Sequence, residues 1–371
     1  MLATVIPRLA GLQVVRVTHL EQQEQDVRAP ASMLVHSKDQ TSRVAESAWG
    51  VVLGAGDGTR LATLTKDKYG TSVPKQFCSL NGGRSLLQET RRRARRLVPA
   101  KRVCAIVARR HAPLWRRALR GMQNENIIVQ PLNRGTGNGV LLATLCIMAR
   151  DPDAKIIFLP SDHYVHQEEA FADSLQTGLL QGLDGELLLI GVQPDAADPD
   201  LGYIMPEAGH RLGVRPVARF VEKPSARVAR ELIQRGALWN TFIFAARAST
   251  LVEIFSRRVP AIVQNMRQAL RATRHPVSYP GAGVGALDDL YATLPVIDFS
   301  RDVLSSMERH LRVLAVPSCG WTDLGTPTRV LAALSRFGER KQPVGVRLPR
   351  TPSLFEYADA QRRRCESQDA I

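Results

Sequence analysis

The chain of 371 residues is 44% hydrophobic, which predicts one large domain or two smaller ones with a sizeable core. It contains no apolar run approaching the roughly 18 residues of a membrane span, so no membrane association is expected. Its five scattered cysteines include no Cys-x-x-Cys pair, which argues against a zinc ribbon or a disulfide framework and favours a reducing cytoplasm.

The net charge of +15 and the sequence pI near 10.2 are unusual. One interpretation is nucleic-acid binding. The other is a set of solvated helix faces, as in the arginine-rich segment from Arg91 to Arg96, where Ala94 and Leu97 provide a buried side. The aromatic residues that single-strand binding uses for stacking are not interleaved with these arginines, so nucleic acid is not the favoured partner. A positive field also favours nucleotide and sugar-phosphate substrates.

Residues 1–47 are polar and irregular, which predicts a mobile extension outside the main fold. From Trp49 onward, short apolar runs alternate with helical patterns. Strands are predicted at 51–53, 103–107, 127–129, 156–159 and 187–192, with helices between them at 85–98, 112–120, 139–149 and 170–182. This alternation is typical of an α/β fold, in which a mainly parallel sheet is covered by helices on both faces. Ligands of such sheets bind beyond the carboxyl ends of the strands, so segments 54–60 and 160–163 should meet there.

The pattern changes after Gly202. Strands are predicted at 219–221, 239–245 and 311–316, and helices at 225–236, 251–271 and 327–337. The main domain is therefore predicted to span residues 48–337. The charged, proline-containing stretch 338–371 is predicted to be a loosely ordered tail.

The first predicted strand leads directly into a loop with glycine at alternate positions, Gly54, Gly56 and Gly58. Glycine lacks Cβ, so the backbone can turn sharply and bring its N–H groups close to a ligand. Arg60 supplies a forked cation suited to phosphate oxygens, and Lys75 supplies a second cation. A strand, a glycine loop and two cations predict a triphosphate-binding cradle.

Two commoner glycine motifs do not fit this loop. The dinucleotide fingerprint needs a third glycine where Thr59 stands, and an acid about twenty residues further on, where Val73 and Pro74 lie. The P-loop closes with Gly-Lys-Ser/Thr, which is absent. A glycine-rich turn after a strand is often only a turn, and it is the two cations that favour phosphate binding here.

The loop sequence Gly-x-Gly-x-Gly-Thr-Arg-Leu, followed by Pro-Lys-Gln-Phe at 74–77, resembles the signature of sugar-nucleotide pyrophosphorylases, and specifically of mannose-1-phosphate guanylyltransferases. Further segments resemble this family in its own order: Gln130-Pro131, Arg134-Gly135-Thr136, Pro160-Ser161-Asp162-His163, Leu201-Gly202-Tyr203-Ile204, Phe220-Val221-Glu222-Lys223-Pro224, Trp239-Asn240-Thr241 and Gly320-Trp321-Thr322-Asp323-Leu324-Gly325. The similarity covers roughly residues 48 to 335. It implies a Rossmann-like nucleotidyltransferase (GT-A-like) fold with a mixed, mainly parallel sheet.

The resemblance implies transfer of GMP from GTP to mannose-1-phosphate, with GDP-mannose and pyrophosphate as products. Such chemistry depends on alignment and charge neutralisation, and Arg60 and Lys75 are the candidate catalytic cations. The similarity further implies nucleotide contacts by Leu53, Gly54, Ala55, Gly56, Gly58, Thr59, Gln130, Arg134, Gly135 and Thr136. It implies sugar-phosphate contacts by Gly202, Tyr203, Glu222, Lys223 and Asn240.

Magnesium is the implied cofactor, with Asp162 and Asp323 as its candidate ligands. This ion is often bound through one or two carboxylates, with phosphates and water completing its shell. The alternative for an aspartate after a strand is a helix cap. The alternative for Glu222 and Lys223 is an exposed ion pair. His163 is assigned no chemistry, because a lone histidine is more often a packing or loop-bonding residue.

The chain departs from the family pattern at several positions. Ala62-Thr63 replaces the usual Trp-Pro, and Gly137-Asn138 replaces Ala-Pro. Phe242 replaces a small residue near the sugar. These departures leave two alternatives: a uridylyl- or thymidylyltransferase acting on another hexose-1-phosphate, and a catalytically weak GDP-sugar-binding regulator. A homo-oligomer is compatible with either.

Overall fold

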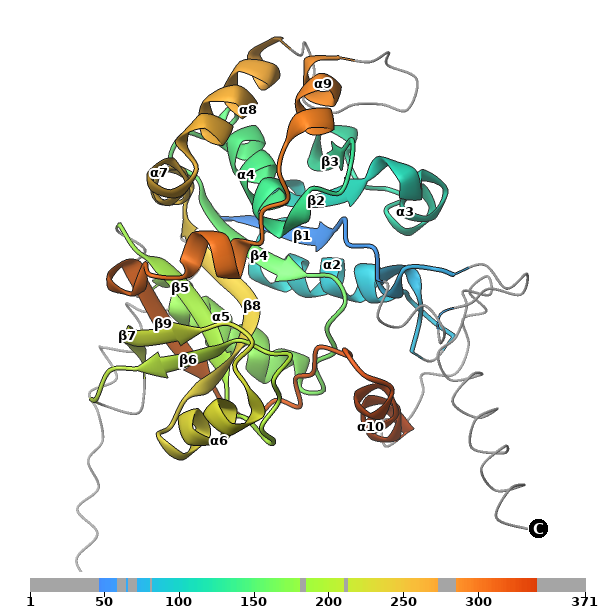
Figure 1. Ribbon diagram of the computed structural model, residues 1–371. Helices are drawn as coiled ribbons and strands as arrows, with labels where there is room; N and C mark the ends of the chain where they lie inside the picture. Colours follow the sequence, from blue (N-terminus) through green and yellow to red (C-terminus); the bar gives the residue numbers. More distant parts are fainter. Residues whose placement is uncertain are drawn as a thin grey trace, which may run out of the picture. The chain divides into compact units, whose positions relative to one another are not determined.

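A mixed β-sheet of nine strands runs through the part of the chain that the computed structural model describes: residues 47–58, 65, 72–80, 82–180, 185–209, 213–272 and 285–338. The strand order is β3-β2-β1-β4-β8-β5-β9-β7-β6. Figure 1 shows this order from β3 near the top to β6 and β7 near the bottom. The predicted extension 1–47 and tail 338–371 lie almost wholly outside the described residues, so both remain predictions.

The first four strands are parallel. They are β1 (Trp49–Gly54), β2 (Val103–Ala108), β3 (Ile127–Gln130) and β4 (Lys155–Pro160), and β1 lies between β2 and β4. Each contains a strand predicted from an apolar run. Because the strands are parallel, the loops after β1 and β4 leave the same edge of the sheet. The Ser161 backbone N–H donates to the Leu53 carbonyl at 3.1 Å, so the two predicted loops meet as expected.

The second half of the sheet is largely antiparallel. Strand β8 (Leu238–Arg247) runs antiparallel to both β4 and β5 (Leu187–Val192), and β9 (Leu311–Val316) runs parallel to β5. The strands β6 (Tyr203–Pro206) and β7 (Val214–Val221) pair antiparallel with each other, and β7 pairs antiparallel with β9. The expected parallel character therefore holds for the first four strands and for β5 with β9. The short connection between β6 and β7 cannot make the long crossover that parallel neighbours need.

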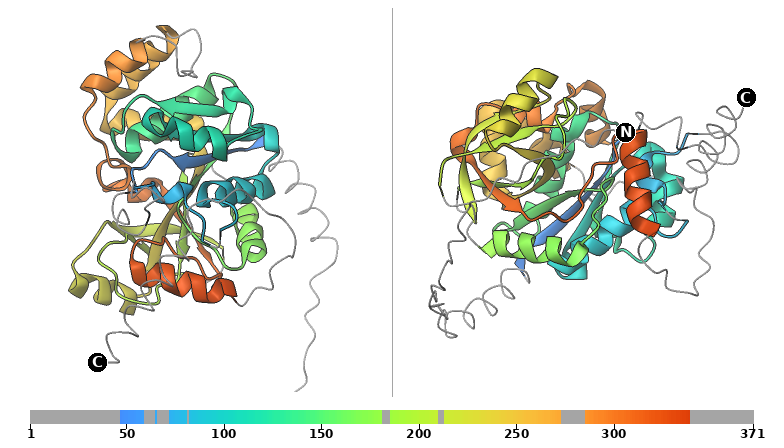
Figure 2. Two further views of the ribbon diagram at one scale, coloured as in Figure 1. Left: turned by 90° about the vertical axis from the view of Figure 1, so that its right-hand side faces the viewer. Right: turned by 90° about the horizontal axis from the view of Figure 1, so that it is seen from below.

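Helices cover both faces of the sheet, because successive strand residues point to opposite sides. Val52 packs in the core with α2 (Leu86–Leu97), α3 (Ala112–Ala118), α5 (Glu168–Leu180), α6 (Ala226–Gln234) and α10 (Pro327–Gly338). Val51 packs in the opposite core with α4 (Gly135–Met148), α7 (Ala248–Arg258), α8 (Pro260–Ala272) and α9 (Ala286–Thr293). Figure 2 shows α2 and α5 side by side.

Two helix predictions needed correction, and one helix was missed. The single helix predicted at 251–271 is two helices, α7 and α8, which break at Val259. Pro260 causes the break, since proline disfavours helical backbone in the residue before it. Helix α4 begins at Gly135, four residues before the predicted start at Gly139. Helix α9, which begins shortly after residues 273–284 that lie outside the described chain, was not predicted.

None of the described helices combines the length and the apolar character of a membrane-spanning segment. The four cysteines in the described part of the chain, Cys78, Cys104, Cys146 and Cys319, are all free and buried.

An ion pair inside the fold joins α2 to α5. Arg93, only 2% exposed, donates through Nε and Nη2 to the Glu168 carboxylate at 3.0 and 2.8 Å. Glu168→Gln is expected to lower the free energy of unfolding by about 3 kcal/mol, because a buried guanidinium loses its counter-charge. Urea denaturation would measure this.

The exposed i,i+4 pair between Arg227 and Glu231 is the matched control. Glu231→Gln should change the free energy of unfolding by no more than about 0.5 kcal/mol, since solvent screens the pair. Equal losses in the two variants would contradict the assigned role of Glu168.

Candidate active site

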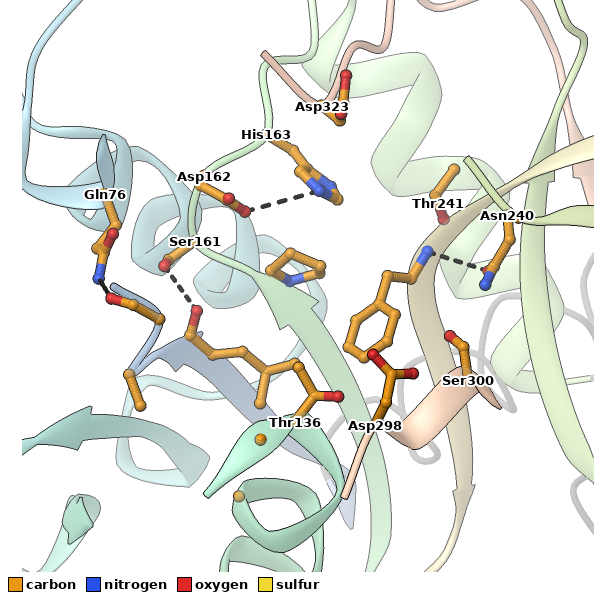
Figure 3. A pocket seen from close by; sticks show the side chains of 18 of the residues that line it. Gln76, Thr136, Ser161, Asp162, His163, Asn240, Thr241, Asp298, Ser300 and Asp323 are labelled. Carbon is orange, nitrogen blue, oxygen red and sulfur yellow. Dashed lines mark hydrogen bonds and ion pairs between the residues drawn. The ribbon is translucent and has the colours of Figure 1, made fainter. Parts of the chain in front are cut away.

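A cavity of about 520 Å³ lies where the loops after β1 and β4 meet. Its wall is also formed by the start of α4, the middle of β8 and the short helix η6 (Phe299–Leu304). Figure 3 shows side chains from these separate segments around one space, with Asp162 and His163 facing Asn240 and Thr241 across it. The carboxyl edge of the parallel strands therefore forms part of a cavity, as the fold class predicts.

Most of the predicted site residues line this cavity: Leu53, Ala55, Gly56, Gly58, Lys75, Gln130, Gly135, Thr136, Asp162, Gly202, Glu222, Lys223, Asn240 and Asp323. Three other predicted site residues that the structure describes do not line the cavity, namely Gly54, Arg134 and Tyr203. Gly54 faces the core, where a Cβ would lie 2.9 Å from Leu87 Cδ1. Thr59 and Arg60 lie outside the described residues.

The glycine loop is held by the side chain of Gln76. Its Nε2 donates to the carbonyls of Gly54 at 3.1 Å and Gly56 at 2.6 Å. Gly58 has φ +63, and a Cβ there would lie 2.6 Å from the Lys75 backbone nitrogen, so only glycine fits without displacement. Gln76 was not predicted as a site residue. Its amide could have been singled out, because it directly follows the predicted Lys75.

Lys75 is the point where distant parts of the chain meet. Its ammonium lies 3.0 Å from the Asp162 carboxylate and donates to the Asp323 carbonyl at 2.8 Å. The side chain is 6% exposed, although it carries a full charge. Residues 75, 162 and 323 are thus brought to one wall of the cavity, beside the glycine loop.

The two aspartates supply carboxylate oxygens, the donor type that magnesium prefers. Asp162 pairs with Lys75, and the Asp323 carboxylate accepts from Arg329 of α10. The described residues contain no group of three or more acidic, histidine or cysteine side chains that could bind a metal by themselves. A magnesium ion here fits only with phosphate oxygens and water completing its shell, which is how this ion usually binds.

His163 lies against the same wall and is 8% exposed. Burial lowers its pKa to about 4, although Asp162 acts in the opposite direction. Its ring packs edge-on against Trp321 with centroids 5.2 Å apart. His163 Nε2 also lies 3.6 Å from Asp162 Oδ1, so the ring contacts both Trp321 and the carboxylate.

The segment predicted to contact the base begins α4. The Gln130 amide donates to the Tyr291 hydroxyl at 3.3 Å, and the Thr136 hydroxyl accepts from the Phe299 backbone N–H at 2.9 Å. Arg134 points elsewhere, because its guanidinium donates to the carbonyls of Tyr291 and Ala292. Arg134 therefore links the segment before α4 to α9 through these hydrogen bonds.

The segment predicted to contact the sugar lies on the other side. Gly202 packs so closely that a Cβ would lie 2.6 Å from Glu222 Oε2. Tyr203 is fully buried, and its hydroxyl hydrogen-bonds with the backbone of Asp198, so its side chain does not reach the cavity. Asn240 Oδ1 accepts from the Phe242 backbone N–H at 3.0 Å.

The Glu222 carboxyl is expected to make stability depend on pH. Burial, and after it the charge of Asp298, raises the pKa of Glu222 from 4.5 to about 7. Ionisation is therefore harder in the folded state, which loses stability as the pH rises from about 4.5 through about 7. Glu222→Gln should match the wild-type Tm near pH 4 and exceed it by roughly 4 °C near pH 8, as measured by calorimetry. The exposed Glu207→Gln is the control, and parallel Tm profiles for Glu222→Gln and wild type would contradict the raised pKa.

Comparison with known proteins agrees with this geometry. A family model described as nucleotidyl transferase matches residues 49–339. The chain is 29% identical over 294 residues to the xanthan biosynthesis protein XanB of Xanthomonas campestris pv. campestris, covering 78% of this chain and 60% of that protein. It is 29% identical over 287 residues to the mannose-1-phosphate guanylyltransferase ManC of Salmonella typhimurium. This alignment covers 74% of this chain and 57% of that protein. The chain therefore spans less than two thirds of the length of these relatives.

A solved structure shares this fold. It is described as mannose-1-phosphate geranyltransferase from Thermus thermophilus, and it aligns with a TM-score of 0.65 and 29% identity. The alignment covers 77% of this chain and 79% of that one.

Proposed function

Because the chain belongs to the nucleotidyl transferase family, we propose that it transfers GMP from GTP to mannose-1-phosphate, giving GDP-mannose and pyrophosphate. One observation carries this proposal: Lys75 lies between Asp162 and Asp323 at the glycine loop, inside a cavity that continues to Glu222 and Asn240. The proposal places the triphosphate on the side of the glycine loop and the sugar phosphate on the side of Glu222 and Asn240. The named relatives support mannose-1-phosphate as the acceptor and guanylyl as the group transferred.

The reaction forms a bond between a sugar-phosphate oxygen and the α-phosphorus of GTP, while the bond from that phosphorus to the β-phosphate bridging oxygen breaks. Lys75 stabilises the charge that develops on the transferring phosphoryl group, because its ammonium is buried and already positioned. Arg60 is proposed to hold the triphosphate together with Lys75. The glycine loop, braced by Gln76, aligns the triphosphate through its N–H groups.

Asp162 and Asp323 are the proposed magnesium ligands, and the ion, when bound, would neutralise charge on the phosphate oxygens. On the base side, Gln130, Gly135 and Thr136 line the cavity. On the sugar side, Gly202, Glu222, Lys223 and Asn240 do so. Glu222 is suited to accept hydrogen bonds from sugar hydroxyls, and Lys223 to contact the sugar phosphate.

The test is a substrate panel. The protein is incubated with magnesium, mannose-1-phosphate and each of GTP, ATP, UTP and dTTP, and pyrophosphate release is measured. GTP should give the highest kcat/KM with this acceptor. Preference for UTP or dTTP would refute the guanylyl assignment. Tight binding of GDP-mannose without consumption of any triphosphate would favour a regulatory role instead.

A further inference from the structure

Strand β8 contains a bulge at the cavity. In its pairing with β5, Phe244 lies opposite Leu189 and Asn240 lies opposite Gly191, so three residues of β8 face a single residue of β5. Side chains complete the hydrogen bonds that the bulge disrupts. Asn240 Oδ1 accepts from the Phe242 N–H, and the Thr241 hydroxyl donates to the Ile190 carbonyl at 2.7 Å. Bulges next to active sites commonly re-aim a side chain, and here the re-aimed residue is Phe242.

Phe242 has a strained backbone. Its φ is +56, a left-handed conformation that glycine adopts freely and that a bulky residue avoids. Four non-glycine residues of the described chain have positive φ: Lys223, Phe242, Ser306 and Leu324. Two of them line the cavity, and Leu324 directly follows the cavity residue Asp323. Strain of this kind gathers at functional sites, where the surrounding structure over-determines the conformation.

The ring of Phe242 is supported from behind. It packs edge-on against Phe244, with centroids 5.9 Å apart, and against Phe299 at 6.0 Å. Phe244 and Phe299 are fully buried and stack on each other at 4.7 Å. Phe242 itself is half-buried, and its remaining surface lines the cavity beside Glu222 and Asn240. A ring supported in this way cannot withdraw to admit a larger ligand.

We propose that Phe242 is the specificity-determining residue of the sugar side. Its ring forms a rigid wall that limits the size of the acceptor, and a hexose phosphate with a 2-acetamido group is the larger acceptor that tests this limit. This inference rests on the proposed function, and it adds a limit on the size of the acceptor. The left-handed backbone conformation of Phe242 is unfavourable, and it is what directs the ring into the cavity.

Two variants separate the ring from the backbone strain. Phe242→Gly removes both, whereas Phe242→Ala removes the ring and keeps a side chain at positive φ. Selectivity is the ratio of kcat/KM for mannose-1-phosphate to that for its 2-acetamido counterpart, measured with GTP. Both variants should lower this ratio by at least about tenfold, since each removes the same steric exclusion. The glycine variant should also melt roughly 3 °C above the alanine variant.

Phe255→Leu is the matched control. Phe255 stacks on Phe299 at 5.7 Å within the same aromatic cluster, but it does not line the cavity. This variant should lower Tm and leave the selectivity ratio unchanged. A ratio unchanged in both Phe242 variants overturns the inference.

Calorimetric binding of the two sugar phosphates in the absence of a triphosphate separates this inference from the proposed function. In one outcome, the wild type consumes no triphosphate while removal of the Phe242 ring raises the affinity for the acetamido sugar phosphate at least about tenfold. That result would refute the proposed reaction and support the size limit set by Phe242. If no triphosphate is consumed and neither sugar phosphate binds to any of the three proteins, both the wall and the proposed reaction are overturned. If the wild type turns over both acceptors at similar rates, the size limit set by Phe242 is refuted and the proposed reaction is not.

Discussion

Replacing Lys75 with methionine is expected to lower kcat by roughly 10²- to 10³-fold, the usual effect of removing one preorganised charge stabiliser. The loss should fall mainly on kcat, because the buried ammonium is placed to act on charge that develops in the transition state. Steady-state pyrophosphate release at saturating GTP and mannose-1-phosphate measures the effect. Methionine retains most of the length of the apolar stem, so the cavity wall should stay filled.

The control for this variant is Lys101→Met, which removes an exposed lysine of the same charge. It should leave kcat within about twofold of wild type, since a distant surface charge is screened. Lys75→Arg is the second variant, because it keeps the charge and changes the shape of the cation. The melting curve shows whether the Lys75→Met protein is folded. If the folded variant turns over at the wild-type rate, Lys75 does not have the proposed catalytic role.

Replacing Asp162 with asparagine is expected to have the second large effect. The variant should lower kcat by roughly 10²-fold and raise the magnesium concentration at half-maximal rate at least about tenfold, since an amide is a weaker ligand than a carboxylate. The variant should also lose some stability, because the buried Lys75 loses its counter-charge, although its hydrogen bond to the Asp323 carbonyl remains. A magnesium titration of the rate, together with the melting temperature, measures both effects.

Asp153→Asn is the control for Asp162→Asn, because Asp153 is exposed in the turn that precedes β4, whereas Asp162 follows the other end of this strand. It should change neither the rate nor the magnesium dependence. Retention of the wild-type magnesium profile by Asp162→Asn would show that the metal binds elsewhere.

Asp323 differs from Asp162 in its surroundings. Its side chain is 9% exposed and accepts from Arg329, which also pairs with Asp198 and lies over the Trp239 ring at 5.3 Å. Its substitution would therefore disturb an ion-pair network as well as the proposed metal ligand. For this reason Asp162 is the cleaner position at which to test the metal.

The site as a whole was only partly accessible to sequence reasoning. Local spacing identified the glycine loop with Lys75, and the position after a strand identified Asp162. Gln76 was missed although it directly follows Lys75, and Arg329 was missed because an isolated guanidinium has no local signature. Their roles come from partners at other points in the chain, Gly54 for one and Asp198 for the other. Arg134 and Tyr203 have side chains that point away from the cavity, and which way a side chain points depends on packing.

The amino-acid sequence by itself determined the alternation of strands and helices, and with it the α/β class and the edge of the sheet where the cavity lies. These features depend on apolar periodicity and turn residues, which are local properties of the chain. Only the tertiary structure decided that β8 runs antiparallel between β4 and β5, and that its bulge presents Phe242 to the cavity. It also placed Lys75 between Asp162 and Asp323. Strand order and such contacts depend on pairings between residues far apart in the chain, and no local pattern encodes them.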